Sequence, residues 1–236
     1  MTTSDAPVLL ACAHGTSSPS GRTAVQRLVD AVAAELPDVE VVPTWVDVQT
    51  PDLAERTEQY AGRPAVVVPL LLSAGYHVYV DVAEAVAADD LHRVSAALGP
   101  DRALARLLAR RVHEACTAAG APLAEHDAVV LATAGSSDRR AVVDCAAVAD
   151  LLAEELGRPV TVSYLAAARP RVAEAVADAR AGLADGGRVV VASYLLAPGH
   201  FHDKLAGAGA DVITAPLLPD DRIAAVLLDR YDAAVG

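Results

Sequence analysis

The stretch VLLACAHGTSS at residues 8–18 joins an apolar run to an abrupt turn of small and polar residues. An uninterrupted apolar run such as Val8 to Ala13 is typical of a strand buried on both faces of a parallel sheet. A helix then follows, with apolar residues at the 3, 4, 7 and 11 spacing of one buried face: Val25, Leu28, Val29, Val32 and Leu36. Pro37 ends it. The chain therefore opens with the strand–turn–helix unit of an α/β fold.

Strands and helices continue to alternate through the first half of the sequence. The pattern predicts strands over 39–46, 66–72 and 93–97, and helices over 78–88 and from about 101 to 120. Alternation at this spacing favours a parallel sheet with helices on both faces.

The second half repeats this plan. Three pairs of short segments match in the same order, at offsets of 120, 124 and 120 residues: 14–17 with 134–137, 71–75 with 195–199, and 101–102 with 221–222. Matches in one order indicate an internal duplication. Because Gly-Ala-Pro at 120–122 breaks the preceding helix, we expect two domains, 1–121 and 122–236.

Composition excludes several classes of protein. The net charge of −12 argues against a nucleic-acid partner. No apolar run approaches the roughly 18 residues of a membrane-spanning helix, and residues 1–7 carry no secretory signal, so a cytoplasmic protein without a membrane partner is expected. Cys12, Cys116 and Cys145 lie far apart, which predicts buried thiols rather than disulfides or a zinc site.

Two histidines of the first half directly follow predicted strands, where parallel sheets collect their ligands. His14 comes after the first strand and His77 after the third, and each lies near a glycine, Gly15 or Gly75. Neutral imidazole binds iron, cobalt, nickel or zinc and can accept a proton near neutral pH. A pair of histidines in matching positions therefore favours a metal site over two structural residues.

The remaining histidines are interpreted differently. His92, His113 and His126 lie in polar surroundings and are expected to be solvated. His200 and His202 follow the strand predicted to end at 196, and either a second-site role or an exposed polar loop fits them. Five cations near second-half loops are candidate anion contacts or ordinary solvated surface: Arg139, Arg140, Arg169, Arg171 and Lys204.

Two motifs carry a resemblance to a known family. The segments LACAHGT at 10–16 and VPLLLSAGYHVYVD at 68–81 resemble the CbiX/SirB family of sirohydrochlorin chelatases, in its long, internally duplicated form. The resemblance implies two Rossmann-like α/β halves facing a cleft that holds a tetrapyrrole. It also implies that His14 and His77 bind the incoming metal and help to remove the pyrrole protons.

The resemblance extends to further candidate residues. Asp81 and Glu84, about one helical turn apart, would orient His77 or relay protons, although a solvated first helical turn explains them equally well. Candidate substrate-binding residues surround the two histidines, with one more from the second half: Gly15, Ser73, Gly75, Tyr76 and His200. Ala134 and Phe201 stand where the duplicate of His14 and His77 would be, so we expect one active site in each chain.

The expected function is insertion of a divalent metal, Co²⁺ or Fe²⁺, into sirohydrochlorin for cobalamin or siroheme biosynthesis. Ni²⁺ is a third candidate ion, no organic cofactor is expected, and a monomer or weak dimer is favoured. The alternative is a carrier of tetrapyrrole or metal without turnover. A histidine phosphatase does not fit, because Ala13 stands where its Arg-His-Gly motif needs arginine, and the chain has no phosphate-binding G-x-x-x-x-G-K-[ST] loop.

Overall fold

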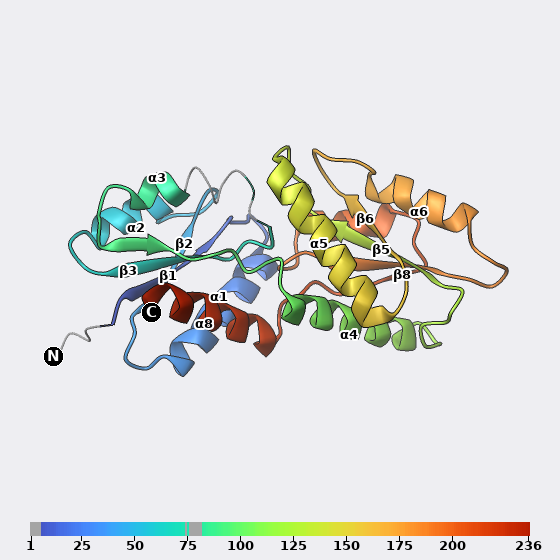
Figure 1. Ribbon diagram of the computed structural model, residues 1–236, viewed down its shortest axis with the longest axis horizontal. Coiled ribbons are helices and arrows are strands. Elements are labelled where there is room, and N and C mark those ends of the chain that lie inside the picture. The colour runs from blue at the N-terminus through green and yellow to red at the C-terminus, as the bar shows by residue number, and fades with distance from the viewer. Residues whose placement is uncertain (1–5, 74, 76–81) are drawn as a thin grey trace. The chain divides into compact units, whose positions relative to one another are not determined.

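The computed structural model describes residues 6–73, 75 and 82–236. Its strands form two parallel sheets with the orders β2-β1-β3-β4 and β6-β5-β7-β8, and helices flank both sheets (Figure 1). The two orders are the same permutation, which confirms the duplicated α/β fold expected from the sequence.

The elements of the first repeat alternate as predicted: β1 (Val8–Ala13), α1 (Pro19–Glu35), β2 (Val41–Trp45), α2 (Leu53–Gln59), β3 (Ala65–Pro69), α3 (Ala83–Val86), β4 (His92–Val94) and α4 (Arg102–Ala118). The second repeat follows the same order: β5 (Ala128–Thr133), α5 (Arg139–Leu156), β6 (Val160–Tyr164), α6 (Val172–Ala181), β7 (Val189–Tyr194), α7 (His200–Lys204), β8 (Val212–Ile213) and α8 (Asp221–Val235).

Each central strand is buried on both faces, because its side chains alternate between two layers of helices. All six residues of β1 are buried. Val8, Leu10 and Cys12 of β1 pack with Leu53 of α2 and with Tyr60, which directly follows α2. The intervening β1 side chains face the other layer, where α1 and α8 lie (Figure 1). This two-sided burial explains why the strand is an uninterrupted apolar run.

The compact units are divided differently from the two sequence repeats 1–121 and 122–236. One unit is Met1–Leu98 with Leu218–Gly236, and the other is Gly99–Leu217. Helix α4 contacts α5, β7 and β8, whereas α8 contacts α1 and β3. Each sheet is therefore completed by the last helix of the other repeat, an arrangement that we call the helix exchange.

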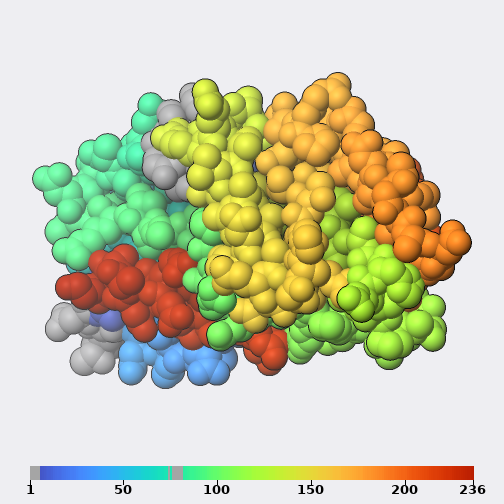
Figure 2. Space-filling model, turned by 45° about the vertical axis from the view of Figure 1, so that its right-hand side comes forward, coloured from blue at the N-terminus to red at the C-terminus, as the bar shows by residue number. Residues whose placement is uncertain are grey.

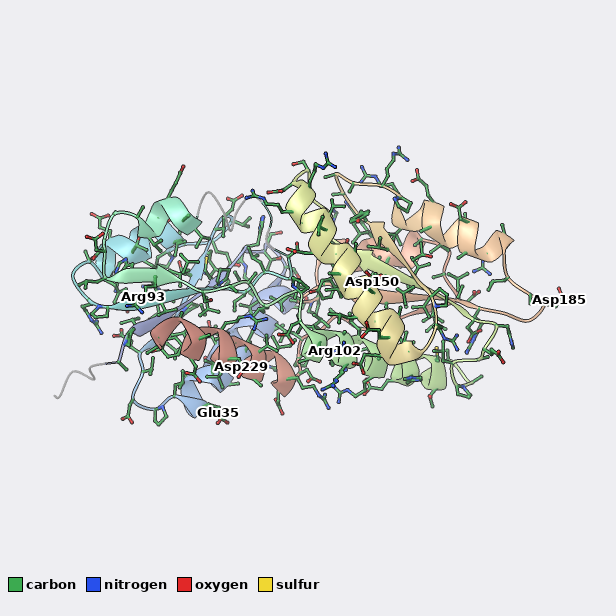
Figure 3. The ribbon with its side chains drawn as sticks, in the orientation of Figure 1. Glu35, Arg93, Arg102, Asp150, Asp185 and Asp229 are labelled. Carbon is green, nitrogen blue, oxygen red and sulfur yellow. The ribbon has the colours of Figure 1, made fainter. Side chains whose placement is uncertain are left out.

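Polar contacts hold both exchanged helices. Arg102 of α4 pairs with Glu154 of α5 at 2.6 Å and with Glu155 at 3.1 Å, and Figure 3 labels Arg102 at the start of α4. Arg230 of α8 donates hydrogen bonds to the carbonyls of Ala97 and Leu98, at 2.8 and 3.0 Å.

In Figure 2, residues of α5 cover much of the viewed face of the second unit.

A buried ion pair anchors the amino edge of the second sheet. Asp127 precedes β5, and its fully buried carboxylate lies 2.6 Å from the guanidinium of Arg188, which precedes β7. Burial alone would raise the pKa of Asp127, but hydrogen bonds from Arg188 and from the backbone N–H of Ala124 lower it to about 2.

In the described part of the chain, no helix is long and apolar enough to cross a membrane.

Candidate functional site

His14 lies on a turn whose backbone is fixed by the neighbouring loop. The parallel ladder between β1 and β2 continues past the strand ends, because Val46 N–H donates to Ala13 O at 2.9 Å and Asp47 N–H to His14 O at 3.0 Å. The residue itself is exposed. His14 is therefore held by its backbone at a rigid part of the sheet's carboxyl edge.

Only glycine fits the next position of this turn. Gly15 has φ of +98°, and a Cβ there would lie 1.9 Å from the carbonyl oxygen of Asp47. Such a contact is far inside any real Cβ approach, and a left-handed φ disfavours other residues. The His-Gly order thus follows from the close passage of two loops.

Side chains close the remainder of the loop. Gln49 Oε1 accepts a hydrogen bond from Thr16 N–H at 2.9 Å, and Arg22 Nε donates to Thr16 O at 2.8 Å. Ser18 caps α1 by accepting from Gly21 N–H at 3.4 Å. The turn is therefore held from both β2 and α1.

The strand that leads to the second candidate histidine lies directly beside β1. Strand β3 pairs with β1, and Leu70 N–H donates to Cys12 O at 2.7 Å just beyond β3. Ser73 and Gly75 are half-buried, and Gly75 N–H donates to Ser73 O at 3.0 Å. The predicted site residues Tyr76, His77 and Asp81 lie outside the described residues.

Two other residues of the first unit bear on the proposed chemistry. Cys12, two residues before His14, is fully buried, and this burial raises its thiol pKa to about 12. It stays a protonated thiol at neutral pH. Glu84 lies exposed in the first turn of α3, as either interpretation of it requires.

Val48 is a strained residue on the loop beside His14. Its φ is +69°, a left-handed conformation that β-branched residues strongly disfavour, and its side chain is 54% exposed. At the duplicate position Ala167 has φ of +57°. Both units therefore build the same loop, and the first one carries the greater strain.

The second unit keeps the turn without the histidine. Leu165 N–H donates to Thr133 O and Ala166 N–H to Ala134 O, both at 2.9 Å. A Cβ on Gly135 would lie 2.0 Å from Ala166 O. The backbone therefore matches that of the His14 turn, with Ala134 in place of the imidazole.

The structure separates the two uncertain histidines of the second half. His202 Nε2 lies 3.0 Å from Thr214 O, which ties α7 to the end of β8. His200, the first residue of α7, is exposed, and its ring stacks on Phe201 at 6.2 Å. His202 thus has a structural partner, whereas His200 stays a candidate.

The expectation of a solvated His92 was wrong. Its side chain is fully buried, with Nε2 3.2 Å from the carbonyl of Tyr60, because the polar stretch around it is strand β4 paired with β3. His113 and His126 are exposed as expected. Across 6–73, 75 and 82–236, no three His, Cys, Asp or Glu side chains cluster as a metal site.

Solved structures with the same fold match almost the whole chain. SirB from Bacillus subtilis with Fe³⁺ has a TM-score of 0.77 and 21% identity, with 98% of this chain and 96% of that chain covered. The sirohydrochlorin chelatase SirB from Bacillus subtilis subspecies spizizenii in complex with cobalt gives 0.74 and 17%, over 98% and 95%.

A third structure, CbiX, described as the terminal enzyme for biosynthesis of siroheme in denitrifying bacteria, gives a TM-score of 0.73 and 19% identity, over 97% of this chain and 100% of that chain. A comparison with curated protein sequences returns no match. The CbiX family model matches twice, over residues 8–115 and 128–234, once for each repeat. The chain therefore belongs to the CbiX family.

Proposed function

We propose that this chain is a metal chelatase that inserts Co²⁺ or Fe²⁺ into sirohydrochlorin, in cobalamin or siroheme biosynthesis. Membership of the CbiX family supports this, as do neighbours of the same fold that are named as sirohydrochlorin chelatases. The metal ion is a substrate, and the reaction uses no organic cofactor.

One observation carries the proposal: both units build the same turn, but only the first places a histidine on it. The turn therefore does not need an imidazole in order to fold. Ala134 O accepts the same backbone hydrogen bond, from Ala166 N–H, that His14 O accepts from Asp47 N–H. Because the backbone geometry does not require His14, its exposed imidazole is best explained by chemistry.

The proposed site is the carboxyl edge of the first sheet. His14 follows β1, and His77 follows the adjacent β3 in the sequence. Two imidazoles would hold an incoming divalent ion while it loses its water ligands. They would also accept the protons that the pyrrole nitrogens release as the metal enters. The neighbouring Cys12 side chain is fully buried in the core, where it packs with Leu53 and Tyr60.

The test is an anaerobic absorbance assay with sirohydrochlorin and Co²⁺, Fe²⁺ or Ni²⁺. Insertion faster than the reaction without protein is expected with at least one ion, and that ion would indicate the pathway. Tight binding of the macrocycle without faster insertion of any ion would instead favour a carrier.

Single substitutions test the two histidines. His14→Ala and His77→Ala should each lower the insertion rate by about 100-fold or more, as for loss of a ligand and proton acceptor. His113→Ala is the matched control, because His113 is exposed on α4. A His14→Ala variant with full activity would remove this residue from the mechanism.

A further inference from the structure

We propose that the carboxyl edge of the second sheet binds the carboxylates of the substrate through Arg139, Arg171 and Lys204, a set that we call the cationic edge. The proposal deepens the proposed function, because sirohydrochlorin carries acetate and propionate groups around its rim. It assigns anion recognition to the unit whose turn has lost its histidine.

The three cations belong to three neighbouring loops of one sheet. Arg139 is the first residue of α5, after β5, and Arg171 is the N-cap of α6, after β6. Lys204 ends α7, after β7. Because the strand order is β6-β5-β7, these loops emerge side by side at the carboxyl edge, where parallel sheets bind ligands. Figure 1 shows the start of α5 and the loop into α6 at the same end of this sheet.

Arg171 occupies a position that local energetics disfavour. In the first unit the same position is Asp52, whose carboxylate accepts from Glu55 N–H at 2.8 Å, while Glu55 accepts from Asp52 N–H. Arg171 makes no side-chain cap, and its positive charge lies at the positive end of the α6 dipole. A residue that breaks a local rule of its own fold marks a site kept for function.

The remainder of the capping arrangement is preserved. Glu174 still accepts a hydrogen bond from Arg171 N–H at 2.8 Å, as Glu55 does from Asp52. Only the residue that should cap the helix has changed from an acid to a cation. This contrast argues for a specific requirement at Arg171 rather than a general loss of the motif.

The change at Arg171 belongs to a wider reversal of charge. The β2–α2 segment 46–56 holds three acids and one arginine, whereas the matching segment 165–175 holds one acid and two arginines. Pro19, which starts α1, is replaced by Arg139 at the start of α5. The whole chain carries a net charge of −12, so a local excess of positive charge in this segment runs opposite to the charge of the protein as a whole.

Other cations of these loops are already paired and are left out of the proposed set. Arg140 binds Asp138 at 2.6 Å, and Arg169 binds Glu174. In the part of the chain that the structure describes, no carboxylate hydrogen-bonds to the guanidinium of Arg139 or Arg171, although the Glu174 carboxylate interacts electrostatically with Arg171. Lys204 Nζ lies 5.4 Å over the ring of Phe201. Arginine forms paired hydrogen bonds with carboxylates, which suits Arg139 and Arg171 to the acidic groups of the macrocycle.

The test measures binding of metal-free sirohydrochlorin by equilibrium absorbance or fluorescence titration. Arg171→Asn should raise Kd by roughly tenfold, as expected for one lost charge-assisted contact. Higher salt should weaken binding to the wild type more than to the variant, because salt screens this contact. Arg180→Asn is the matched control: it removes the same charge from the other end of α6, where Arg180 binds Asp211 at 2.9 Å, and it should leave Kd unchanged.

A second readout separates recognition from folding. Arg171→Asn supplies a side-chain cap for α6, so its melting temperature should rise while macrocycle binding weakens. Arg171→Lys should retain more binding than Arg171→Asn. A variant Arg171→Asn that binds like the wild type, or that weakens binding no more than Arg180→Asn, would overturn the proposal.

The proposed function and the cationic edge can fail separately. Binding that depends on Arg171 without insertion of any metal would keep the cationic edge and reject the chelatase. Normal insertion with an unchanged KM for sirohydrochlorin in Arg171→Asn and in Arg139→Asn would keep the chelatase and reject the cationic edge. If the proposed function and the cationic edge are both correct, Arg171→Asn and Arg139→Asn should raise KM for the macrocycle with little change in KM for the metal.

Discussion

The carboxyl edges of the two sheets share one backbone and differ in their side chains. A Cβ at Gly15 would lie 1.9 Å from Asp47 O, and one at Gly135 would lie 2.0 Å from Ala166 O. The backbone hydrogen bonds that extend the strand pairing beside these glycines are 2.9–3.0 Å long in the first unit and 2.9 Å long in the second. The duplicated turn has therefore been kept as a scaffold while its chemistry has diverged.

The divergence has a direction. The first edge presents an imidazole and acidic loop residues, and the second presents arginines and a lysine. An imidazole suits a metal ion, and guanidinium groups suit carboxylates. This contrast is the basis of our proposal that the first unit binds the metal and the second binds the acidic macrocycle.

The amino edges of the two sheets differ as well. Pro7 and Pro64 precede β1 and β3, where the second unit has Asp127 and Arg188. The equivalent backbone hydrogen bonds remain, from Val8 N–H to Pro64 O at 2.8 Å and from Ala128 N–H to Arg188 O at 2.9 Å. Here the difference concerns stability, because the ion pair is remote from the carboxyl edge.

The largest expected effect comes from the paired substitutions Gly15→Ala and Gly135→Ala. Each should cost about 3 kcal/mol of unfolding free energy, since each forces a Cβ into a backbone carbonyl at a left-handed φ. Urea unfolding followed by circular dichroism measures both. At a temperature where both variants are folded and with saturating sirohydrochlorin, only Gly15→Ala should lose metal insertion, because Gly135 lies on the edge proposed to bind the macrocycle and its change should act through KM. Equal loss of insertion in both would contradict the assignment of metal chemistry to the first edge.

Asp127→Asn should have the next largest effect, roughly 2 kcal/mol of lost stability at pH 7. The pKa of Asp127 falls from its ordinary 3.8 to about 2 in the folded protein. The stabilisation that the ionised Asp127 gives to the folded state is therefore complete above about pH 5, and it is lost as the pH falls through 4 towards 2. Unfolding curves from pH 7 to 2 should show wild type and variant converging at low pH. A constant difference across this range would rule out the ionised carboxylate as the cause.

Asp52→Arg places the residue of the second unit into the first. It removes the side-chain cap of α2 and adds a cation at the helix N-terminus, which should cost about 1 kcal/mol. Melting temperature is the readout, and Asp52→Asn is the control because asparagine retains a capping oxygen. If Asp52→Arg is as stable as the wild type, the cost that we assign to Arg171 is not real.

Val48→Gly should give the smallest change and the only gain, about 0.5 kcal/mol of added stability. Glycine removes the left-handed strain at φ of +69° but adds entropy to the unfolded chain. Ala167→Gly should gain less, because alanine is strained less than valine at such a φ. Thermal unfolding of both variants tests the order, and a loss of stability in Val48→Gly would show that its side chain packs usefully.

Much of the fold could be predicted from the sequence because local patterns were clear. The predicted strand at 39–46 corresponds to β2 (Val41–Trp45), and the predicted helix from about 101 to 120 corresponds to α4 (Arg102–Ala118). Turn residues and apolar runs fix such elements within a few residues. The position of His14 at a strand end followed from the same patterns.

The remaining errors share one cause, which is that contacts between distant segments carry no local signal. The polar setting of His92 suggested solvent, but pairing with β3 and the carbonyl of Tyr60 bury it. The sequence leaves two roles open for His202, and only the fold brings its ring to the carbonyl of Thr214. The unusual N-cap at Arg171 is apparent only from the structure, in which Asp52 and Arg171 are the N-cap residues of the equivalent helices α2 and α6.

The sequence by itself determined the α/β class, the duplication and the family, because periodicity, repeated segments and the motif around His14 are local properties of the chain. Only the tertiary structure decided that α4 completes the second sheet and α8 the first. The reason is physical: the two helices present similar apolar faces, and the two sheets offer similar surfaces. Which helix covers which sheet depends on the path of the chain and on contacts such as those of Arg102 and Arg230.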